Sequence, residues 1–310
     1  MTILFKADSV VSGAEKWRAT LKQRLPDMAF RTSDEPGDPA DVEYVLCFRA
    51  TPGTFTGMTN LRAILATGAG VDGLFLDPGL PECPIARIVD PWMAEQMVGW
   101  SVYAVHHFYR RFGDYAALQA EGTWFEYDDW EAAPPKVGLL GYGAIGAKVG
   151  AALQALRFDV ATWTRSPRDI PGVASFSGPD GLMAFLGQTH FLICLLPLTP
   201  ETEGILNART LAALPKPAYL INLARGGHVV TADLVQALQS GTLAGAFLDV
   251  TEPEPLPPGH PLWSMPNVRI TPHCSGPTNA ATAADQVADN IRRAEAGRPM
   301  LNLVDRGRRY

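Results

Sequence analysis

The fold is decided by the stretch Val137-Gly-Leu-Leu-Gly141-Tyr-Gly143-Ala-Ile-Gly146, in which a short apolar run leads into three glycines spaced GxGxxG. The apolar run predicts a buried strand, and the proline-free residues 147–156 predict a helix behind the glycines. A strand, a glycine turn and a helix in this order let backbone N–H groups and the helix N-terminus attract phosphate. We therefore predict dinucleotide binding. The expected contacts are Gly141, Gly143, Ala144, Ile145 and Gly146.

Further apolar runs recur along the chain after the glycines. They lie at 160–163, 191–196, 219–222, 246–250 and 268–271. Helix-length segments separate most of these runs, and near-continuous apolar strands interleaved with helices indicate a parallel sheet covered on both faces. The sequence thus predicts a doubly wound α/β (Rossmann) architecture for this part of the chain. The preceding residues alternate short apolar runs with Pro/Gly/Asp-rich breaks and predict a smaller α/β unit.

A long helix is expected where the two parts of the chain meet. Asp90-Pro91 places a helix-capping residue before a proline at the first helical position, and residues 92–112 contain no proline. This helix carries Tyr103, Phe108 and other aromatic or Met side chains, more than one buried stripe needs. They either belong to the core of the same chain or form a partner surface. We predict a homodimer in which this helix participates.

Composition excludes several classes of protein. The 310 residues, 47% of them hydrophobic and 19% charged, predict a globular chain of roughly two domains. A net charge of -6 without a basic stripe argues against a nucleic-acid partner, and no apolar run approaches the roughly 20 residues of a membrane span. The four cysteines show no CxxC pairing and no signal peptide is evident, which predicts a reducing cytoplasm. No metal site is predicted.

The residues after the second strand of the Rossmann part bear on the choice of dinucleotide. An NAD-specific site places Asp or Glu about 20 residues beyond the glycines, to bind the ribose 2'-hydroxyl. Here the sequence is Thr164-Arg165-Ser166-Pro-Arg168, whose guanidinium and hydroxyl donors suit a 2'-phosphate. We therefore predict NADP(H), with NAD(H) possible, bound by Thr164, Arg165, Ser166 and Arg168. The alternative is that both arginines only solvate a loop.

Two polar residues shortly after predicted strands could carry chemistry. Arg225 offers planar donors that hold a carboxylate and polarise a neighbouring carbonyl, and His273 can deliver a proton near neutral pH. Taken alone, either could be structural. An acid beside the imidazole would favour its charged form, and the spacing does not choose between Glu252 and Glu254. Because a nicotinamide supplies only hydride, this set of groups suits the reduction of a keto group.

Together, four motifs resemble the D-isomer-specific 2-hydroxyacid dehydrogenase family over nearly the whole chain. They are the glycine fingerprint, Asn-Leu-Ala-Arg-Gly from 222, Leu-Asp-Val-x-x-x-Glu-Pro from 248 and Pro-Leu-Trp-x-x-Pro-Asn-Val-x-x-Thr-Pro-His from 261. Trp-Thr-Arg-Ser from 163 and the C-terminal Val-Asp-Arg-Gly-Arg-Arg-Tyr are similar to the glyoxylate/hydroxypyruvate reductase A branch. The resemblance implies NADPH-dependent reduction of glyoxylate to glycolate and of hydroxypyruvate to D-glycerate.

The resemblance also implies roles for individual residues. Arg225 would bind the substrate carboxylate and carbonyl, His273 would be the general acid, and Glu254 rather than Glu252 would orient and charge it. Further coenzyme contacts implied by the family are Leu195, Pro197, Thr202, Leu223, Ala224 and Asp249.

The family pattern implies a discontinuous first domain. Residues 1–89 and 277–310 would form a flavodoxin-like α/β substrate domain, into which the nucleotide domain, residues 90–276, is inserted.

Within the expected substrate domain, the backbone amides of Ala69 and Gly70 would bind the substrate carboxylate. Phe48 would line the substrate pocket, although a plain core position is a comparable interpretation. Cys274 stands where many relatives have a small apolar residue, which leaves the preferred keto acid open. The alternatives are a reductase of a bulkier 2-keto acid and a nicotinamide-sensing regulatory protein on the same scaffold.

Overall fold

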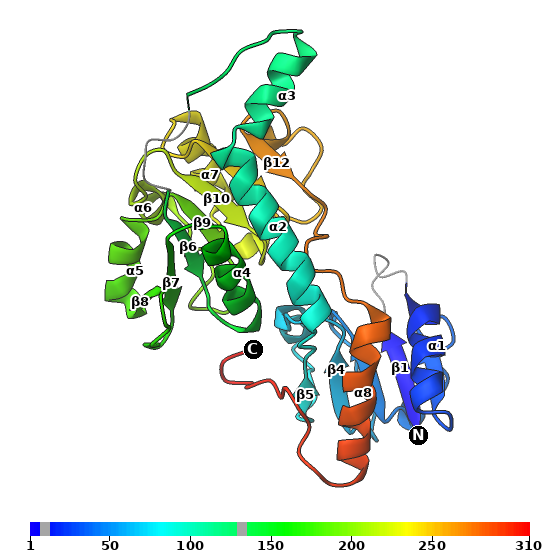
Figure 1. Ribbon diagram of the computed structural model, residues 1–310. Helices are drawn as coiled ribbons and strands as arrows, with labels where there is room; N and C mark the ends of the chain where they lie inside the picture. Colours follow the sequence, from blue (N-terminus) through cyan, green and yellow to red (C-terminus); the bar gives the residue numbers. More distant parts are fainter. Residues whose placement is uncertain (7–12, 129–134) are drawn as a thin grey trace. The chain divides into compact units, whose positions relative to one another are not determined.

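The computed structural model describes residues 1–6, 13–128 and 135–310 (Figure 1). The chain divides into two compact units. The first combines Met1–Met93 with Thr278–Tyr310, and the second is Ala94–Pro277. Each unit is built on its own parallel sheet.

The first unit contains a five-stranded sheet with the order β2-β1-β3-β4-β5. Its strands are β1 (Thr2–Lys6), β2 (Ala29–Thr32), β3 (Tyr44–Cys47), β4 (Ala63–Ala66) and β5 (Ile85–Ala86). Its helices are α1 (Ala14–Arg24), η1 (Pro39–Asp41), η2 (Asp72–Leu76) and α8 (Ala280–Glu295). All strand pairs are parallel, and this order is the flavodoxin-like one.

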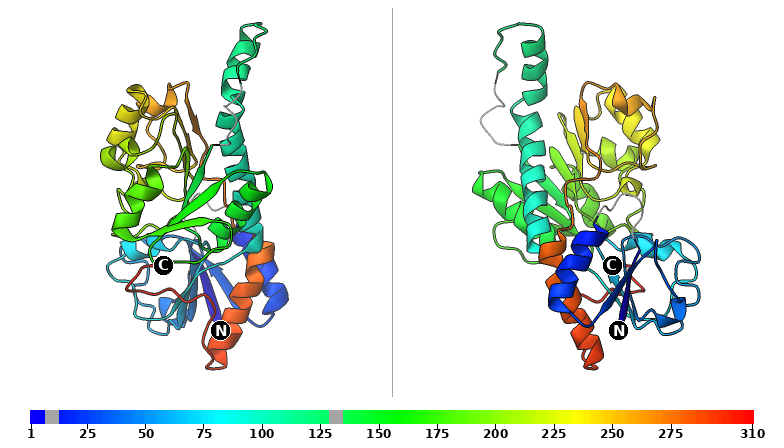
Figure 2. Two further views of the ribbon diagram at one scale, coloured as in Figure 1. Left: turned by 60° about the vertical axis from the view of Figure 1, so that its left-hand side comes forward. Right: turned by 90° about the vertical axis from the view of Figure 1, so that its right-hand side faces the viewer.

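The C-terminal helix α8 packs beside α1 on one face of this first sheet, as both views in Figure 2 show. Val287 and Ile291 of α8 share a core cluster with Ile3 and Phe5 of β1. The helix ends before Gly297, whose φ of 63° is a left-handed conformation that favours glycine. Residues far apart in sequence therefore form one core.

The second unit contains a seven-stranded parallel sheet with the order β12-β11-β10-β9-β6-β7-β8. The strands are β6 (Val137–Leu140), β7 (Val160–Thr164), β8 (Ala174–Ser177), β9 (Phe191–Cys194), β10 (Tyr219–Asn222), β11 (Gly245–Leu248) and β12 (Val268–Ile270). The helices are α2 (Pro91–Tyr109), α3 (Phe112–Ala120), α4 (Ala144–Ala155), α5 (Gly178–Leu186), α6 (Ala208–Ala212), η3 (Gly226–His228), α7 (Thr231–Gln239) and η4 (Pro261–Trp263). The order reverses between β6 and β9, which defines the switch point where doubly wound sheets bind ligands.

Helices cover both faces of this second sheet. α2 and α4 contribute Val105 and Val149 to one core cluster, and α5, α6 and α7 contribute Phe185, Leu211 and Leu234 to the other. Double coverage explains why the central strands are almost continuously apolar. The predicted α/β fold, with a doubly wound parallel sheet and a smaller flavodoxin-like sheet, is confirmed.

The helix expected over 92–112 is shorter than predicted at its C-terminal end. Asp90 caps its start as expected, accepting a 3.0 Å hydrogen bond at Oδ1 from the backbone N–H of Trp92. The helix ends at Tyr109, because Arg111 takes a left-handed φ of 54° and a separate helix, α3, begins at Phe112. The expected boundary was wrong because neither Arg111 nor Phe112 is of a residue type that typically ends a helix.

The helix expected over 147–156 begins three residues earlier, at Ala144. The sequence interpretation was wrong here because it treated the whole glycine motif as a turn. Two edge strands, β2 and β8, were missed as well. Each is at least partly exposed along its length and lacks a continuous apolar run.

No helix in the described part of the chain combines the length and apolar character needed to cross a membrane. The four cysteines are free thiols, with Cys47 and Cys194 buried. Across residues 1–6, 13–128 and 135–310, no three His, Cys, Asp or Glu side chains are grouped so that they could hold a metal ion.

Candidate active site

The candidate catalytic residues follow three adjacent strands of the second sheet. Arg225 comes after β10, Asp249 and Glu254 come after β11, and His273 comes after β12. These strands are parallel neighbours, so their carboxyl ends lie at one edge of the sheet. Ligand sites of doubly wound sheets lie outside this edge. The strand order thus brings to one edge of the sheet groups that are up to 48 residues apart in the sequence.

His273 and Glu254 form a direct pair. The Nδ1 atom of His273 lies 2.7 Å from the Oε1 atom of Glu254, and the two side chains are 31% and 41% exposed. Of the two acids that the sequence left open, Glu254 is therefore the one in contact, whereas Glu252 is exposed and its backbone carbonyl accepts the hydroxyl of Thr231. With Nδ1 directed at a carboxylate, the second ring nitrogen, Nε2, is the one positioned for chemistry.

Asp249 fixes the loop that carries His273. Its buried carboxylate accepts hydrogen bonds from the Thr271 hydroxyl at 2.6 Å and from the backbone N–H groups of Cys274 and Ser275 at 2.9 Å each. Its carbonyl accepts the N–H of His273 at 2.8 Å. These bonds hold His273 at a φ of 50°, a left-handed conformation that side chains other than glycine seldom adopt. Asp249, predicted as a coenzyme contact, is thus an anchor of the histidine loop.

The turn bearing Arg225 is held by Asn222 and Gly226. The buried Asn222 side chain donates to the carbonyl of Arg225 at 2.8 Å and accepts the N–H of Ala224 at 3.2 Å. A Cβ on Gly226 would collide with the backbone of Thr251, so only glycine allows the β10 and β11 loops to approach this closely. Sequence reasoning gave neither residue a role, although both belong to the Asn-Leu-Ala-Arg-Gly motif.

The three fingerprint glycines serve three different purposes. Gly141 has a φ of 98°, which glycine adopts without strain. A Cβ on Gly146 would collide with the carbonyl of Gly141, so this glycine lets the first turn of α4 approach the β6 loop. A Cβ on Gly143 would meet nothing within 4 Å, and this residue precedes the N-terminus of α4 without a side-chain cap. Open space before uncapped helix N–H groups fits a diphosphate.

The loop after β7 lies against the fingerprint. The guanidinium of Arg168 donates from Nη1 to the carbonyl of Tyr142 at 2.9 Å. The Thr164 hydroxyl donates to the carbonyl of Ser166 at 2.8 Å, which shapes the turn, and Arg165 is exposed beside it. The four predicted 2'-phosphate contacts therefore form one loop at the end of β7.

The remaining predicted coenzyme contacts border the switch point. The N–H of Leu195 donates to the carbonyl of Leu140 at 2.9 Å, so the chain after β9 runs beside the end of β6. The Thr202 hydroxyl closes the following loop by donating to the carbonyl of Pro197 at 2.7 Å. Leu223 and Ala224, the other two contacts expected from the family, are largely buried, at 4% and 8% exposed.

The residues expected to bind substrate in the first unit also cluster. Phe48 follows β3, and Ala69 and Gly70 follow the neighbouring strand β4. A Cβ on Gly68 would lie 2.9 Å from the Phe48 ring, so the aromatic side chain packs directly on this loop. Ala69 and Gly70 are half-buried. The sheet order thus gathers Phe48 and the two backbone amides at one edge.

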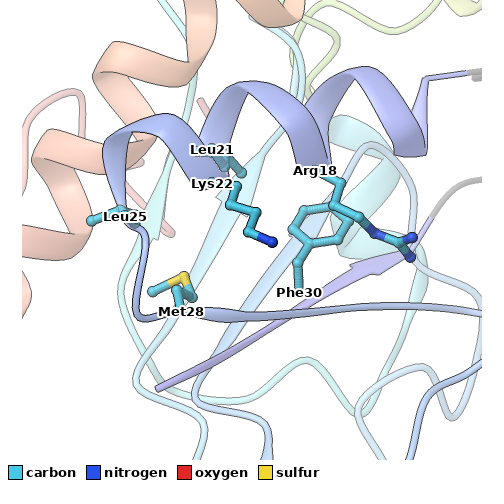
Figure 3. Close-up of a pocket in the computed structure, with 6 residues that line it drawn as sticks. All are labelled: Arg18, Leu21, Lys22, Leu25, Met28 and Phe30. Atoms are coloured by element: carbon cyan, nitrogen blue, oxygen red, sulfur yellow. The ribbon is translucent and has the colours of Figure 1, made fainter.

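A separate hollow of about 160 Å³ lies in the first unit, between α1 and the chain leading into β2 (Figure 3). Its lining residues are Arg18, Leu21, Lys22, Leu25, Met28 and Phe30. The Arg18 guanidinium lies 5.7 Å from the centre of the Phe30 ring, a cation–π distance. None of the predicted site residues lines this hollow, so it is distinct from the candidate active site.

A glycine fingerprint at the switch point, with an arginine and a carboxylate–imidazole pair at neighbouring strand ends, is the arrangement of a dinucleotide-dependent oxidoreductase. Residues 102–275 match the family model described as D-isomer specific 2-hydroxyacid dehydrogenase, NAD binding domain. The chain belongs to the D-isomer-specific 2-hydroxyacid dehydrogenase family. The predicted family membership is confirmed.

Individual relatives resemble the chain over almost its whole length. A glyoxylate/hydroxypyruvate reductase A from Serratia proteamaculans is 43% identical over 298 residues, which are 94% of this chain and 95% of that protein. A D-isomer specific 2-hydroxyacid dehydrogenase from Xanthobacter autotrophicus Py2, crystallised with NADPH and MES, has a TM-score of 0.93 and 40% identity, with 99% of each chain covered. An NADPH-dependent glyoxylate/hydroxypyruvate reductase from Sinorhizobium meliloti, in complex with NADP and sulfate, has a TM-score of 0.93 and 34% identity, with 100% of each chain covered.

Proposed function

We propose that this protein is an NADPH-dependent reductase of small 2-keto acids, which converts glyoxylate to glycolate and hydroxypyruvate to D-glycerate. The observation that carries the proposal is the 2.7 Å pair of His273 and Glu254 at the same sheet edge as Arg225. Two of the similar proteins, from Serratia proteamaculans and Sinorhizobium meliloti, are named as glyoxylate/hydroxypyruvate reductases. This similarity supports the proposed class of substrate.

The residues present fit a dinucleotide. The open space where a Cβ of Gly143 would lie and the uncapped start of α4 suit its diphosphate, and the donors of Arg165 and Ser166 suit a 2'-phosphate. When bound, the coenzyme supplies a hydride to the carbonyl carbon. We assign Leu195, Pro197, Thr202, Leu223, Ala224 and Asp249 to the walls and supports of this coenzyme site.

In the proposed mechanism, the chain binds the substrate carboxylate and moves one proton. The guanidinium of Arg225 binds the carboxylate and polarises the carbonyl, and the amides of Ala69 and Gly70 bind the same carboxylate. His273 donates the proton on Nε2 to the carbonyl oxygen as the carbon accepts hydride, which yields the 2-hydroxy acid and a neutral imidazole. Glu254 holds Nδ1–H and thereby orients the ring.

We assign residues 1–89 and 277–310 to the substrate domain, with Phe48 at its pocket, and residues 90–276 to the nucleotide domain. The two compact units, which divide at Met93 and at Pro277, support this assignment. A reducing cytoplasm is proposed as the compartment, and the four free thiols support it.

The proposed activity is tested by following reduced-nicotinamide absorbance with the purified protein, crossing NADPH and NADH against glyoxylate, hydroxypyruvate, pyruvate and phenylpyruvate. The two small C2 and hydroxylated C3 acids are expected to give the highest kcat/KM. Preference for phenylpyruvate would instead identify a reductase of bulkier acids. Coenzyme binding without turnover of any keto acid would point to a sensing protein.

Changing Arg165 to Ala is expected to weaken NADPH specifically. Loss of a charge-assisted hydrogen bond to a 2'-phosphate costs about 1.5–3 kcal/mol, so kcat/KM for NADPH should fall by about 10- to 100-fold. The value for NADH should change little, because NADH lacks that phosphate. Arg209→Ala, a change of an exposed arginine on α6 of the same unit, is the control. An unchanged ratio of NADPH to NADH efficiency in Arg165→Ala would contradict the assignment.

We also propose a homodimer that involves α2. Much of this helix is core, as Phe108 stacks on Tyr219 at 4.6 Å and Trp100 lies 5.9 Å from Phe247. Tyr103 is nevertheless 49% exposed, and Phe112 at the start of α3 is 52% exposed. Light scattering is expected to give about 67 kDa, twice the chain mass of 33.5 kDa. A mass of one chain at micromolar concentration would refute the dimer.

A further inference from the structure

His228 is a buried histidine with no part in the mechanism above. It ends the short turn η3 that begins directly after Arg225, and its side chain is fully buried. Its Nδ1 atom lies 3.1 Å from the carbonyl oxygen of Arg225, and its Nε2 atom lies 3.2 Å from the carbonyl oxygen of Pro197. Both ring nitrogens therefore face backbone carbonyl oxygens, which only accept hydrogen bonds, and the Cys194 side chain makes a further hydrogen bond with the ring.

This geometry distinguishes the two protonation states of the ring. A neutral imidazole carries a proton on one nitrogen, so its second nitrogen would direct a lone pair at a carbonyl oxygen. The imidazolium donates from both nitrogens and satisfies both carbonyls. Because a ring lone pair directed at a carbonyl oxygen is unfavourable in a buried site, the two carbonyls favour the charged ring.

The neighbouring groups favour the same state. Burial disfavours the charged ring and is the largest single influence on its pKa. The Cys194 side chain at the end of β9 opposes this effect by hydrogen bonding and, as a thiolate, by its negative charge, and the two carbonyls add to it. Together they raise the pKa of His228 from 6.5 to about 9. Cys194 faces the ring from β9, the Pro197 segment faces it with a carbonyl, and the Arg225 guanidinium belongs to the same turn.

We infer that His228 is a buried cationic positioning residue, which uses both ring N–H groups to tie the turn of the substrate arginine to the Pro197 loop of the coenzyme site. The backbone supports the same connection. Gly204 N–H donates to the carbonyl of Gly227, and Leu206 N–H donates to the carbonyl of His228, each at 2.9 Å. The catalytic consequence rests on the proposed function, because it concerns where Arg225 holds the substrate carboxylate.

The variant His228→Gln tests this role without removing all support. The carbonyl of Arg225 keeps its bond from Asn222, and the carbonyl of Pro197 keeps its bond from Thr202. A glutamine amide cannot supply two divergent N–H groups to both carbonyls, so the arginine turn loosens. The KM for glyoxylate is expected to rise about tenfold. Turnover at saturating glyoxylate should change by less than about threefold, because the His273–Glu254 pair is untouched.

The protonation state of the His228 ring is measured by NMR of the full-length protein, in which the six histidines are labelled with ¹⁵N. We expect one imidazole, absent from His228→Gln, to keep protons on both nitrogens at pH 7.5 and to lose one with a midpoint near pH 9. Cys194→Ala should lower this midpoint. The spectrum of His273→Asn separates the catalytic ring from the buried one.

His190 provides the matched control, since it precedes the same strand, β9, that Cys194 ends. Its Nδ1 accepts the Lys136 N–H at 3.3 Å, and burial with the Lys136 charge lowers its pKa. His190→Gln should leave both the doubly protonated signal and the glyoxylate KM unchanged. A neutral His228 at pH 7.5, or a glyoxylate KM in His228→Gln equal to that of wild type, would overturn the inference.

If His228→Gln does not fold, the wild-type titration and its shift in Cys194→Ala still decide the charge of the ring. The NMR result does not depend on turnover. A wild-type protein that reduces no keto acid would therefore reject the proposed function while leaving the protonation of His228 to be decided separately.

Discussion

His273→Asn is expected to lower kcat for glyoxylate reduction by about 10²- to 10⁴-fold, the range that a positioned general acid supplies. Asparagine is uncharged and cannot deliver a proton from the place of Nε2 to the carbonyl oxygen. The KM for NADPH should stay near the wild-type value, because the glycine fingerprint joins β6 to α4, whereas His273 follows the edge strand β12. Steady-state rates on the folded variant measure both quantities. Turnover within a factor of about two of wild type would exclude His273 as the acid.

Paired changes of the two neighbouring acids sharpen this result. Glu254→Gln removes the charge that lies 2.7 Å from Nδ1, so kcat should fall substantially. Glu252→Gln is the matched control, since Glu252 lies two residues away in the same loop and is exposed. Its change should leave kcat as in wild type. Equal losses in the two variants would mean that the loop, and not the carboxylate on His273, is responsible.

Arg225→Ala is expected to lower kcat/KM for glyoxylate by about 10³-fold, because one side chain both binds the carboxylate and stabilises charge on the carbonyl oxygen. Arg225→Lys should recover only part of the loss, since an ammonium keeps the charge but lacks the planar pair of donors. The coenzyme dissociation constant, measured by fluorescence titration, should change little. A lysine variant with full activity would show that the charge alone suffices.

The main architecture could be predicted because it follows from local patterns. Apolar runs such as 191–196 identify central strands, since burial on both faces leaves no polar positions. The edge strands β2 and β8 could not be predicted in this way, because they are at least partly exposed along their whole length and lack an apolar run. The end of α2 near Arg111 also could not be predicted, because Arg111 adopts its left-handed conformation without a glycine or proline to indicate it.

Site residues could be predicted from the sequence where the residue type itself is reactive. Residues that act through contacts with distant parts of the chain could not. Arg225 and His273 were found as reactive groups after strands, but the choice of Glu254 over Glu252 came only from family resemblance. Gly226 and His228 act through the loops after β11 and β9, respectively, and such long-range contacts are invisible in a single sequence.

The same difficulty applies to Asp249. Its carboxylate binds the backbone of residues 274 and 275, which fixes the histidine loop. Nothing in the local sequence distinguishes this anchoring acid from one that contacts a ligand.

The central claim is most directly tested by incubating the wild-type protein with hydroxypyruvate and NADPH that carries two deuterium atoms at the nicotinamide C4 position. Hydride transfer to the carbonyl carbon, followed by protonation of the oxygen, predicts D-glycerate with one deuterium on C2. Chiral chromatography with mass spectrometry reads both properties. Glycerate without deuterium, glycerate of the L configuration, or no glycerate at all would contradict the account.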